Sequence, residues 1–197
     1  MTAPVLPAYI PDELCTTLGI EADRDLNPDA PEACLDALNA DLQDDHVSAA
    51  GLEPEQLDEL QQVVADARAD GIDLKVVVID QNPWMDTALR DVATEVGINH
   101  PDATVLVLSP SFAGTYSTTY DRVTLEAGED YAKAVPGNPA AATQAFVDQL
   151  QAPQFPWTGL TIALVILVAL AMAATRALQV RARRTAPPST PESTPAP

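Results

Sequence analysis

The most restrictive feature of this 197-residue chain is a run of nineteen residues without a charged side chain, from Trp157 to Thr175. As a helix that rises 1.5 Å per residue, the run would be about 28 Å long, which is close to the thickness of the hydrocarbon core of a bilayer. A helix buried in a soluble core usually keeps a polar face, and this run has none. The sequence therefore predicts a single transmembrane helix, with Trp157 as an interfacial aromatic residue.

Charge is divided unevenly on the two sides of this run. The whole chain has 29 acidic and 10 basic residues and a formal net charge of −19. Four arginines and one glutamate follow residue 175, so residues 1–155 keep 28 acidic and 6 basic residues, a net charge of −22. Such a polyanion repels phosphate backbones, which argues against nucleic acid as a partner. The predicted transmembrane helix makes the lipid bilayer the expected partner.

Two orientations of the chain are open. Arg176, Arg181, Arg183 and Arg184 follow the span closely, so the positive-inside rule places the C-terminus in the cytoplasm and the acidic body outside the cell. The opening residues, MTAPVLPAYIPDELC, contain neither a basic n-region nor an apolar h-region and are unlike a signal peptide. The competing topology is a tail-anchored protein with its body in the cytoplasm.

The two cysteines bear on this choice. Cys15 and Cys34 lie nineteen residues apart in the N-terminal part of the chain. An oxidising compartment could join them, which would stabilise the body by about 3 kcal/mol in the chain-entropy model. The alternative is that they are two unrelated small apolar residues. With the body outside the cell, we expect Cys15 and Cys34 to be bonded to each other.

The body shows the alternating pattern of a mixed α/β domain. Residues 7–30 are rich in Pro and Asp and predict an irregular entry with at most one short helical turn. Segments 113–117 and 120–127 predict an antiparallel extension near the edge of the sheet. Helical spacing of apolar residues predicts helices at 32–43, 53–70, 86–97 and 138–151, and continuous apolar runs predict buried parallel strands at 74–80 and 104–109. Asp86 is the expected cap of its helix, and Gly71 and Gly97 are the expected stops.

These patterns divide the chain into five segments. The body is expected to be an N-terminal Pro/Asp-rich segment followed by an α/β domain. The last segment begins basic, continues rich in Pro, Ser and Thr, and cannot bury a core, so we expect it to be disordered. The predicted segments are 1–43 (Pro/Asp-rich, with a short helix), 44–151 (α/β domain), 152–156 (linker), 157–175 (transmembrane helix) and 176–197 (tail).

Five polar residues are candidates for a functional site. Open α/β sheets bind ligands beyond the carboxyl ends of their strands. Asp80 ends the first predicted strand, Ser109 ends the second, and Asp86 and Arg90 begin the helix between them. Asp102 precedes the second strand and is expected at the opposite edge of the sheet. The structural alternative is that Asp86 caps a helix and pairs with Arg90 at i, i+4, while Asp80 is a turn residue.

Signatures of chemistry are otherwise few. The sequence contains no nucleophile-elbow, zinc-protease, phosphate-loop or dinucleotide motif. Residues 23–29 place oxygen ligands at alternate positions as a calcium loop does, but Pro28 stands where that loop needs Gly, and Cys34 stands where it needs Glu. His46 and His100 each lack a second histidine near them in the sequence. We therefore expect no cofactor and no organised metal site, and at most weak association of calcium.

Four linked segments carry a resemblance to a known family. They are GIDLKVVVIDQNPWMDTALRDVATEVG (71–97), HPDATVLVLSPSFAGTYS (100–117), RVTLEAGEDYAKA (122–134) and FVDQLQAPQFPWT (146–158). Together they resemble the actinobacterial single-span membrane protein family related to the TPM domain, over residues 44–175. The resemblance implies a TPM-like α/β sandwich, in which a mixed sheet is flanked by helices. The region from Cys15 to Pro31 looks like an addition to that pattern.

The resemblance also bears on function. TPM-type domains include membrane-tethered extracytoplasmic proteins, some with acid phosphatase activity or calcium binding. Their second strand is introduced by Asp-Asn-Gly, whereas here it is Asp102-Ala103-Thr104, so only the aspartate matches. Relatives are often encoded beside NlpC/P60 cell-wall peptidases. The hypothesis is thus a non-enzymatic membrane-anchored domain that binds or regulates a wall-remodelling partner, such as a peptidoglycan peptidase. The alternative is a divalent-metal-dependent acid phosphatase of the TPM type.

Overall fold

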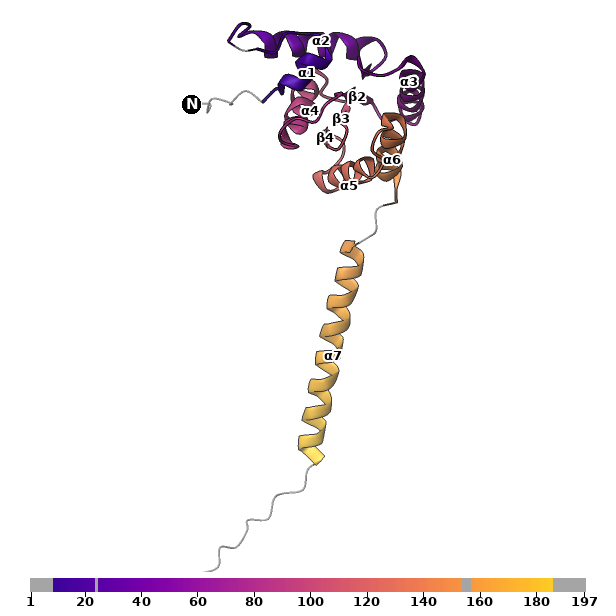
Figure 1. The fold of residues 1–197 in the computed structure, drawn as a ribbon. Coiled ribbons are helices and arrows are strands. Elements are labelled where there is room, and N and C mark those ends of the chain that lie inside the picture. The colour runs from indigo at the N-terminus through magenta and orange to yellow at the C-terminus, as the bar shows by residue number, and fades with distance from the viewer. Residues whose placement is uncertain (1–8, 24, 154–156, 186–197) are drawn as a thin grey trace, which may run out of the picture. The chain divides into compact units, whose positions relative to one another are not determined.

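The structure, a computed structural model, describes residues 9–23, 25–153 and 157–185 and falls into two units, Met1–Ala152 and Pro153–Pro197 (Figure 1). The first unit is the body. Its helices are α1 (Asp12–Thr17), α2 (Ala30–Asp44), α3 (Pro54–Ala69), α4 (Thr87–Asn99), α5 (Arg122–Lys133) and α6 (Pro139–Gln151), and its strands are β1 (Val47–Ser48), β2 (Leu74–Val78), β3 (Thr104–Leu108) and β4 (Ala113–Tyr116). The second unit contains α7 (Trp157–Thr185).

The four strands form one mixed sheet in the order β1-β2-β3-β4. β1, β2 and β3 are parallel, and β4 is antiparallel to β3 at the edge. Val76 of β2 is therefore opposite Val47 on one side and Leu106 on the other. This confirms the predicted mixed α/β fold, the parallel pair and the antiparallel strand at 113–117. β1 was not predicted, because two residues are too few to show any periodicity.

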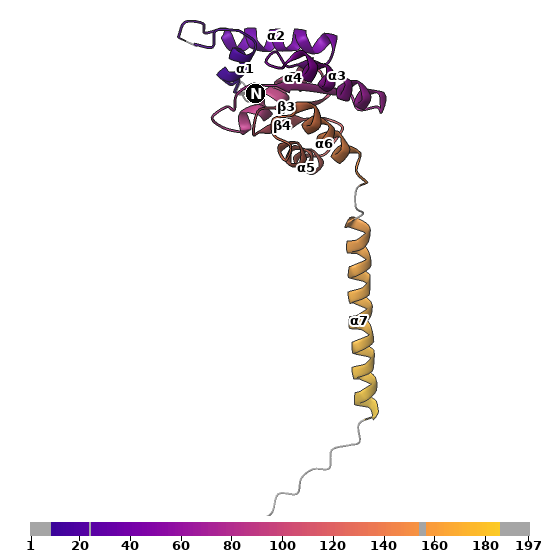
Figure 2. The ribbon, with the colours of Figure 1, turned by 45° about the vertical axis from the view of Figure 1, so that its right-hand side comes forward.

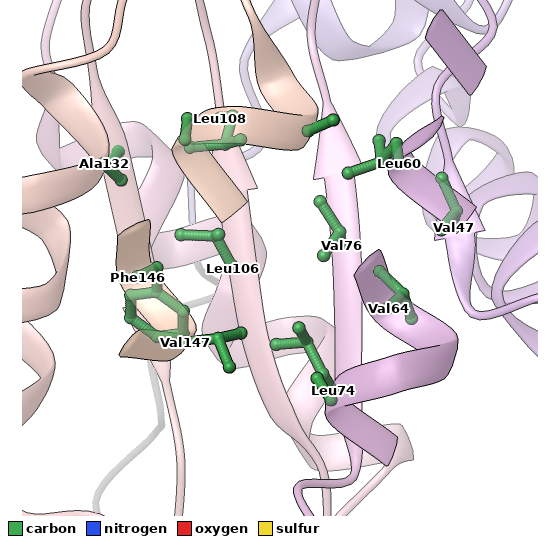
Figure 3. Packing of buried hydrophobic residues seen from close by; sticks show 14 of the residues in the cluster. Val47, Leu60, Val64, Leu74, Val76, Leu106, Leu108, Ala132, Phe146 and Val147 are labelled. Carbon is green, nitrogen blue, oxygen red and sulfur yellow. The ribbon is translucent and has the colours of Figure 1, made fainter. Parts of the chain in front are cut away.

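Helices cover both faces of the sheet (Figures 1 and 2). On one face, Leu74, Val76 and Leu106 are fully buried against α3, α5 and α6. Figure 3 shows these strand side chains between Leu60 of α3 and Phe146 of α6. Each large apolar side chain that is removed from water here stabilises the fold by about 1.5–3 kcal/mol. Burial on both faces explains why β2 and β3 are mostly apolar on both faces instead of alternating between apolar and polar residues.

The other face of the sheet is covered by α1, α2 and α4. Val77 and Ile79 pack there with the buried leucines Leu38 and Leu42 of α2. The predicted segment 1–43 thus shares a core with the α/β domain. α2 and α3 confirm the helices that were predicted at 32–43 and 53–70, and α1 is the short helix expected in the entry segment.

The prediction of an extended strand at residues 120–127 was wrong, because most of that segment belongs to α5. Asp121 caps the helix, and its side chain accepts a hydrogen bond from the N–H of Thr124 at 2.8 Å. Gly128 lies on the inner face, where a β-carbon would be 2.5 Å from Cδ2 of Phe146. The glycine therefore permits close contact of α5 with α6. Val123 and Thr124, which are β-branched, favoured a strand prediction over the helical spacing of the segment.

The predicted end of α4 at Gly97 was also wrong, because the helix continues to Asn99. Gly97 is required for packing, since a β-carbon there would overlap the ring of Tyr116 on β4. Asp86 does occupy the N-cap position, but its side chain makes no capping hydrogen bond. In contrast, Gly71 ends α3 as predicted, with a left-handed φ of +92°.

The second unit contains a candidate membrane-spanning helix. Within α7, Gly159–Ala182 is a candidate span of 24 residues; it contains an 18-residue window with a mean hydropathy of 2.2, and none of that window is buried within the protein. This confirms one candidate C-terminal span. The helix also includes residues 176–185, which were expected to begin the tail, because Ala, Leu, Gln and Arg are good helix formers. Residues 186–197 lie outside the described part of the chain.

Candidate functional site

A cavity of about 240 Å³ lies at the carboxyl ends of the three parallel strands. We call it the carboxyl-edge cavity. The segments that follow β1, β2 and β3 form one side, and the connection between α5 and α6 forms the other. Its apolar walls include Leu52, Val78, Leu108, Phe112, Val135 and Pro136, and the polar groups at its margin are Gln56, Asp80, Ser109, Ser111, Lys133 and Asn138.

Asp80 is held at this cavity by α1. The hydroxyl of Thr17 donates to Oδ1 of Asp80 at 2.6 Å, and the N–H of Asp80 donates to the same hydroxyl at 3.3 Å. α1 is fixed in turn by Cys15, whose sulfur lies at disulfide-bonding distance from that of Cys34, with the two Cα atoms 5.2 Å apart. Both cysteines are buried. The expected cysteine pair therefore connects α2 to the short helix that positions Asp80.

Ser109 is held by Asn82, which was not among the predicted site residues. Its hydroxyl donates to Oδ1 of Asn82 at 2.8 Å, and the same oxygen accepts a hydrogen bond from the N–H of Ser111 at 2.9 Å. Asn82 thus ties the loop after β2 to the loop after β3. The signal that could have revealed it is the Asn82-Pro83 dipeptide, which is typical of turns.

Asp86 and Arg90 line a second cavity of about 250 Å³ between α4 and α5, the α4–α5 cavity. The structure therefore places Asp80 with Ser109 in one cavity and Asp86 with Arg90 in a neighbouring one. Phe112 lines both. Asp102 precedes the amino end of β3, at the opposite edge of the sheet, as expected.

Arg90 pairs with α5. Its Nη2 lies 3.8 Å from a carboxylate oxygen of Glu126 and 4.0 Å from one of Glu129. Among the described residues, these pairs replace the expected pairing with Asp86. Because α5 was predicted as a strand, neither glutamate was recognised as a neighbour of Arg90.

Glu129 is the buried centre of this network. Its side chain is only 6% exposed, and its Oε1 accepts hydrogen bonds from the hydroxyl of Thr115 at 2.5 Å and from Nη2 of Arg122 at 3.3 Å. A buried carboxylate is stable only with such partners. The signal that was available is the i, i+4, i+7 spacing of Arg122, Glu126 and Glu129, which places them on one face of a helix.

A second polar cluster lies at the amino edge of the sheet. Lys75 of β2 is 95% buried and donates to the carbonyl of Leu42, in the last turn of α2, at 2.7 Å. Its Nζ is also 3.1 Å from Nδ1 of His46. Since an ammonium group can only donate, Nδ1 of His46 accepts, and the ring is neutral. Burial, followed by Arg68, lowers the pKa of Lys75.

The pKa values of His46 and His100 are both lowered at this edge of the sheet. Burial is the main cause for each, and the nearby cations Arg68 and Lys75 add to it for His46. For His100, Lys75 and His46 are the additional causes. In the sequence, each histidine lacks a second histidine nearby. The fold brings the two imidazoles to the same edge of the sheet, where His46 is close enough to influence the pKa of His100.

We expect the body to lose stability as the pH falls from 7.5 to 5.5. Both histidines have pKa values below 6.5 in the folded protein, so the unfolded chain takes up protons first, and folding is weakened below about pH 6.5. Urea unfolding of the full chain in detergent at several pH values measures this slope. The double variant His46→Gln, His100→Gln should have a flatter slope, and an unchanged slope would contradict the assignment.

An α/β body with one candidate C-terminal transmembrane helix places the chain in the class of membrane proteins with a single candidate span. The chain belongs to the family described as "Membrane protein Rv1476", whose model matches residues 9–189. It is similar to the membrane protein Rv1476 of Mycobacterium tuberculosis (strain ATCC 25618 / H37Rv), with 46% identity over 185 residues that cover 94% of this chain and 87% of the relative.

One solved structure has a partial likeness to this chain. It is the N-terminal domain of the cg2496 protein from Corynebacterium glutamicum, with 14% sequence identity and a TM-score of 0.45 over 54% of this chain and 78% of that one. A likeness of this degree carries no argument about fold or function. The relationship to the TPM domain stays a prediction.

Proposed function

We propose that this protein is a non-enzymatic, membrane-anchored domain that acts at the outer face of the cell membrane by binding another envelope protein, for example a peptidoglycan peptidase. The observation that supports the proposal is the residue composition of the carboxyl-edge cavity. Its walls are mainly apolar, and its polar groups lie at the margin, which is the usual composition of a binding pocket.

The polar groups at the margin serve to hold loops together. A catalytic serine needs an adjacent base, but the partner of Ser109 is the amide oxygen of Asn82. Oδ1 of Asp80 accepts from Thr17, and both histidines belong to the cluster at the opposite edge of the sheet. This arrangement favours recognition over chemistry.

Two features support an extracytoplasmic body with a cytoplasmic C-terminus. The arginines that follow the apolar run favour this orientation by the positive-inside rule. The cysteine pair is poised to form a disulfide, and such bonds persist outside the cytoplasm. The TPM-like character that the sequence suggests fits the same location.

Site-specific photocrosslinking in native membranes tests the proposal. A photoreactive residue at Gln56 or Ser111, on the margin of the carboxyl-edge cavity, is expected to give a discrete crosslinked product with an envelope protein. The matched control is Asp36, an exposed position on α2. Absence of a product from the two margin positions, or an equal product from Asp36, would contradict the proposal that an envelope protein binds at this cavity.

The alternative, a metal-dependent phosphatase, is expected to fail an activity assay. Phosphoryl transfer needs positive charge opposite the phosphate oxygens, whereas Arg90 and Lys133 beside the cavities are already paired with carboxylates. We expect the full chain in detergent to hydrolyse a generic phosphomonoester no faster than Asp80→Ala or Asp102→Ala, with or without divalent cations. Turnover of about 1 per second that either substitution abolishes would favour the enzyme instead.

A further inference from the structure

The basic side chains of the described body are all engaged within the body. Lys75 is buried against Leu42 and His46, as described above. Arg68 forms an ion pair with Asp73, and Lys133 donates to Asp130 at 2.8 Å. Arg90 and Arg122 are both committed to the glutamates of α5. Arg24, the remaining basic residue of the body, lies outside the described residues.

The carboxylates are engaged to a much smaller extent. The ion pairs between described residues use four of them, Asp73, Glu126, Glu129 and Asp130, whereas residues 1–155 contain 28 acidic residues. The positive charges are thus paired with carboxylates or buried within the body, and the electrostatic field at its surface is negative. Such a field attracts cationic partners and repels anionic ones, and it acts on the rate of association as well as on affinity.

The carboxyl-edge cavity combines this field with apolar walls. Leu52, Phe112 and Val135 line the cavity and are only partly buried, so a ligand can cover them further. Asp80 is exposed at the margin. Its Oδ1 accepts from Thr17, whereas its Oδ2 has no hydrogen bond with any described residue and can accept one from a ligand. The other charged group on the lining, Lys133, is neutralised by Asp130.

We infer that the partner segment that enters the carboxyl-edge cavity is a basic peptide, in which an apolar side chain fills the cavity and a flanking Lys or Arg lies against Asp80. The inference rests on the proposed function and names the chemistry of its partner. Apolar contact gives affinity for any side chain of suitable size, and the charge around the cavity selects the basic segment.

Peptide titration followed by NMR tests the inference on the full chain in a zwitterionic detergent. The probes are two peptides with the same central leucine, one flanked by lysines and the other by glutamates. The amide signals of Ser109, Ser111 and Gly137, which line the cavity, are expected to shift and saturate with the basic peptide. Its affinity should be at least about ten-fold higher than that of the acidic peptide, and it should fall in about 0.3 M sodium chloride.

Two variants sharpen the result. Asp80→Asn is expected to weaken the basic peptide several-fold, and Asp36→Asn, on the exposed surface of α2, should leave its affinity unchanged. Equal binding of both peptides, or shifts that spread over α2 and α3 and omit the cavity, would overturn the inference. Crosslinks from Gln56 and Ser111 together with equal peptide binding would refute only the charge preference. A preference for the basic peptide without crosslinks would refute only the envelope partner.

Discussion

Substitution of Gly114 by alanine is expected to destabilise the body more than the same added methyl group does at Gly71. A β-carbon at Gly114 would lie 2.5 Å from the backbone N of Arg90 and 2.7 Å from Cβ of Leu89, so β4 and α4 must move apart. Overpacking against backbone atoms costs about 3 kcal/mol, and the midpoint of thermal unfolding should fall by about 6–12 °C. Near-ultraviolet circular dichroism of the full chain in detergent measures the change.

Gly71→Ala is the matched control for this substitution. It adds the same methyl group at a position with no neighbouring atom within 4 Å, and its cost comes only from the left-handed φ of +92°. That cost is about 1–2 kcal/mol. Equal losses in the two variants would show that the close contact between β4 and α4 is not what requires Gly114.

A reporter that is active only in the cytoplasm is expected to be silent when it is fused ahead of Met1 and fully active when it is fused after Pro197. We expect the four arginines after the apolar run to set this orientation, because positive charge tends to be retained on the cytoplasmic side. Their joint replacement by glutamine should reduce the contrast between the two fusions. Asp148→Asn, which changes the nearest acidic residue before the span, should not, because acidic residues contribute little to orientation.

The state of the cysteines provides an independent reading of the orientation. Mass spectrometry of unreduced peptides should find Cys15 linked to Cys34 in protein taken from native membranes. An active reporter at the N-terminus together with two free thiols would instead support the tail-anchored topology.

Much of the fold could be predicted from the sequence because its strands are buried on both faces. Leu74–Val78 and Thr104–Leu108 are apolar at every position except Lys75 and Thr104, and α3 shows a regular apolar face that ends at Gly71. The predictions failed at buried helix positions where a glycine or a charged residue stands instead of the usual apolar side chain. Gly97 and Gly128 allow close helix contacts, and Glu129 is a charged residue on the buried face of α5, so none of the three looks like part of a core helix.

The candidate site was less predictable, because it depends on contacts between residues distant in sequence. The positions of Asp80 and Ser109 at one sheet edge followed from the ends of two parallel strands. The partner of Asp80, Thr17, lies 63 residues away on α1, and no periodicity relates the two. Likewise, the separation of Asp86 and Arg90 into a second cavity depends on where α5 packs, and that helix had been assigned to the sheet.

Phe112 is a shared wall between the two cavities, and this has a thermodynamic consequence. A ligand that displaces the ring from one side changes the volume on the other, where Arg90 and Glu129 lie. Occupancy of the first cavity and the arrangement of the ion-pair network are then linked functions. If the ligand shifts the equilibrium between two arrangements of the network, a change that stabilises one arrangement alters the affinity for the ligand by the same coupling free energy.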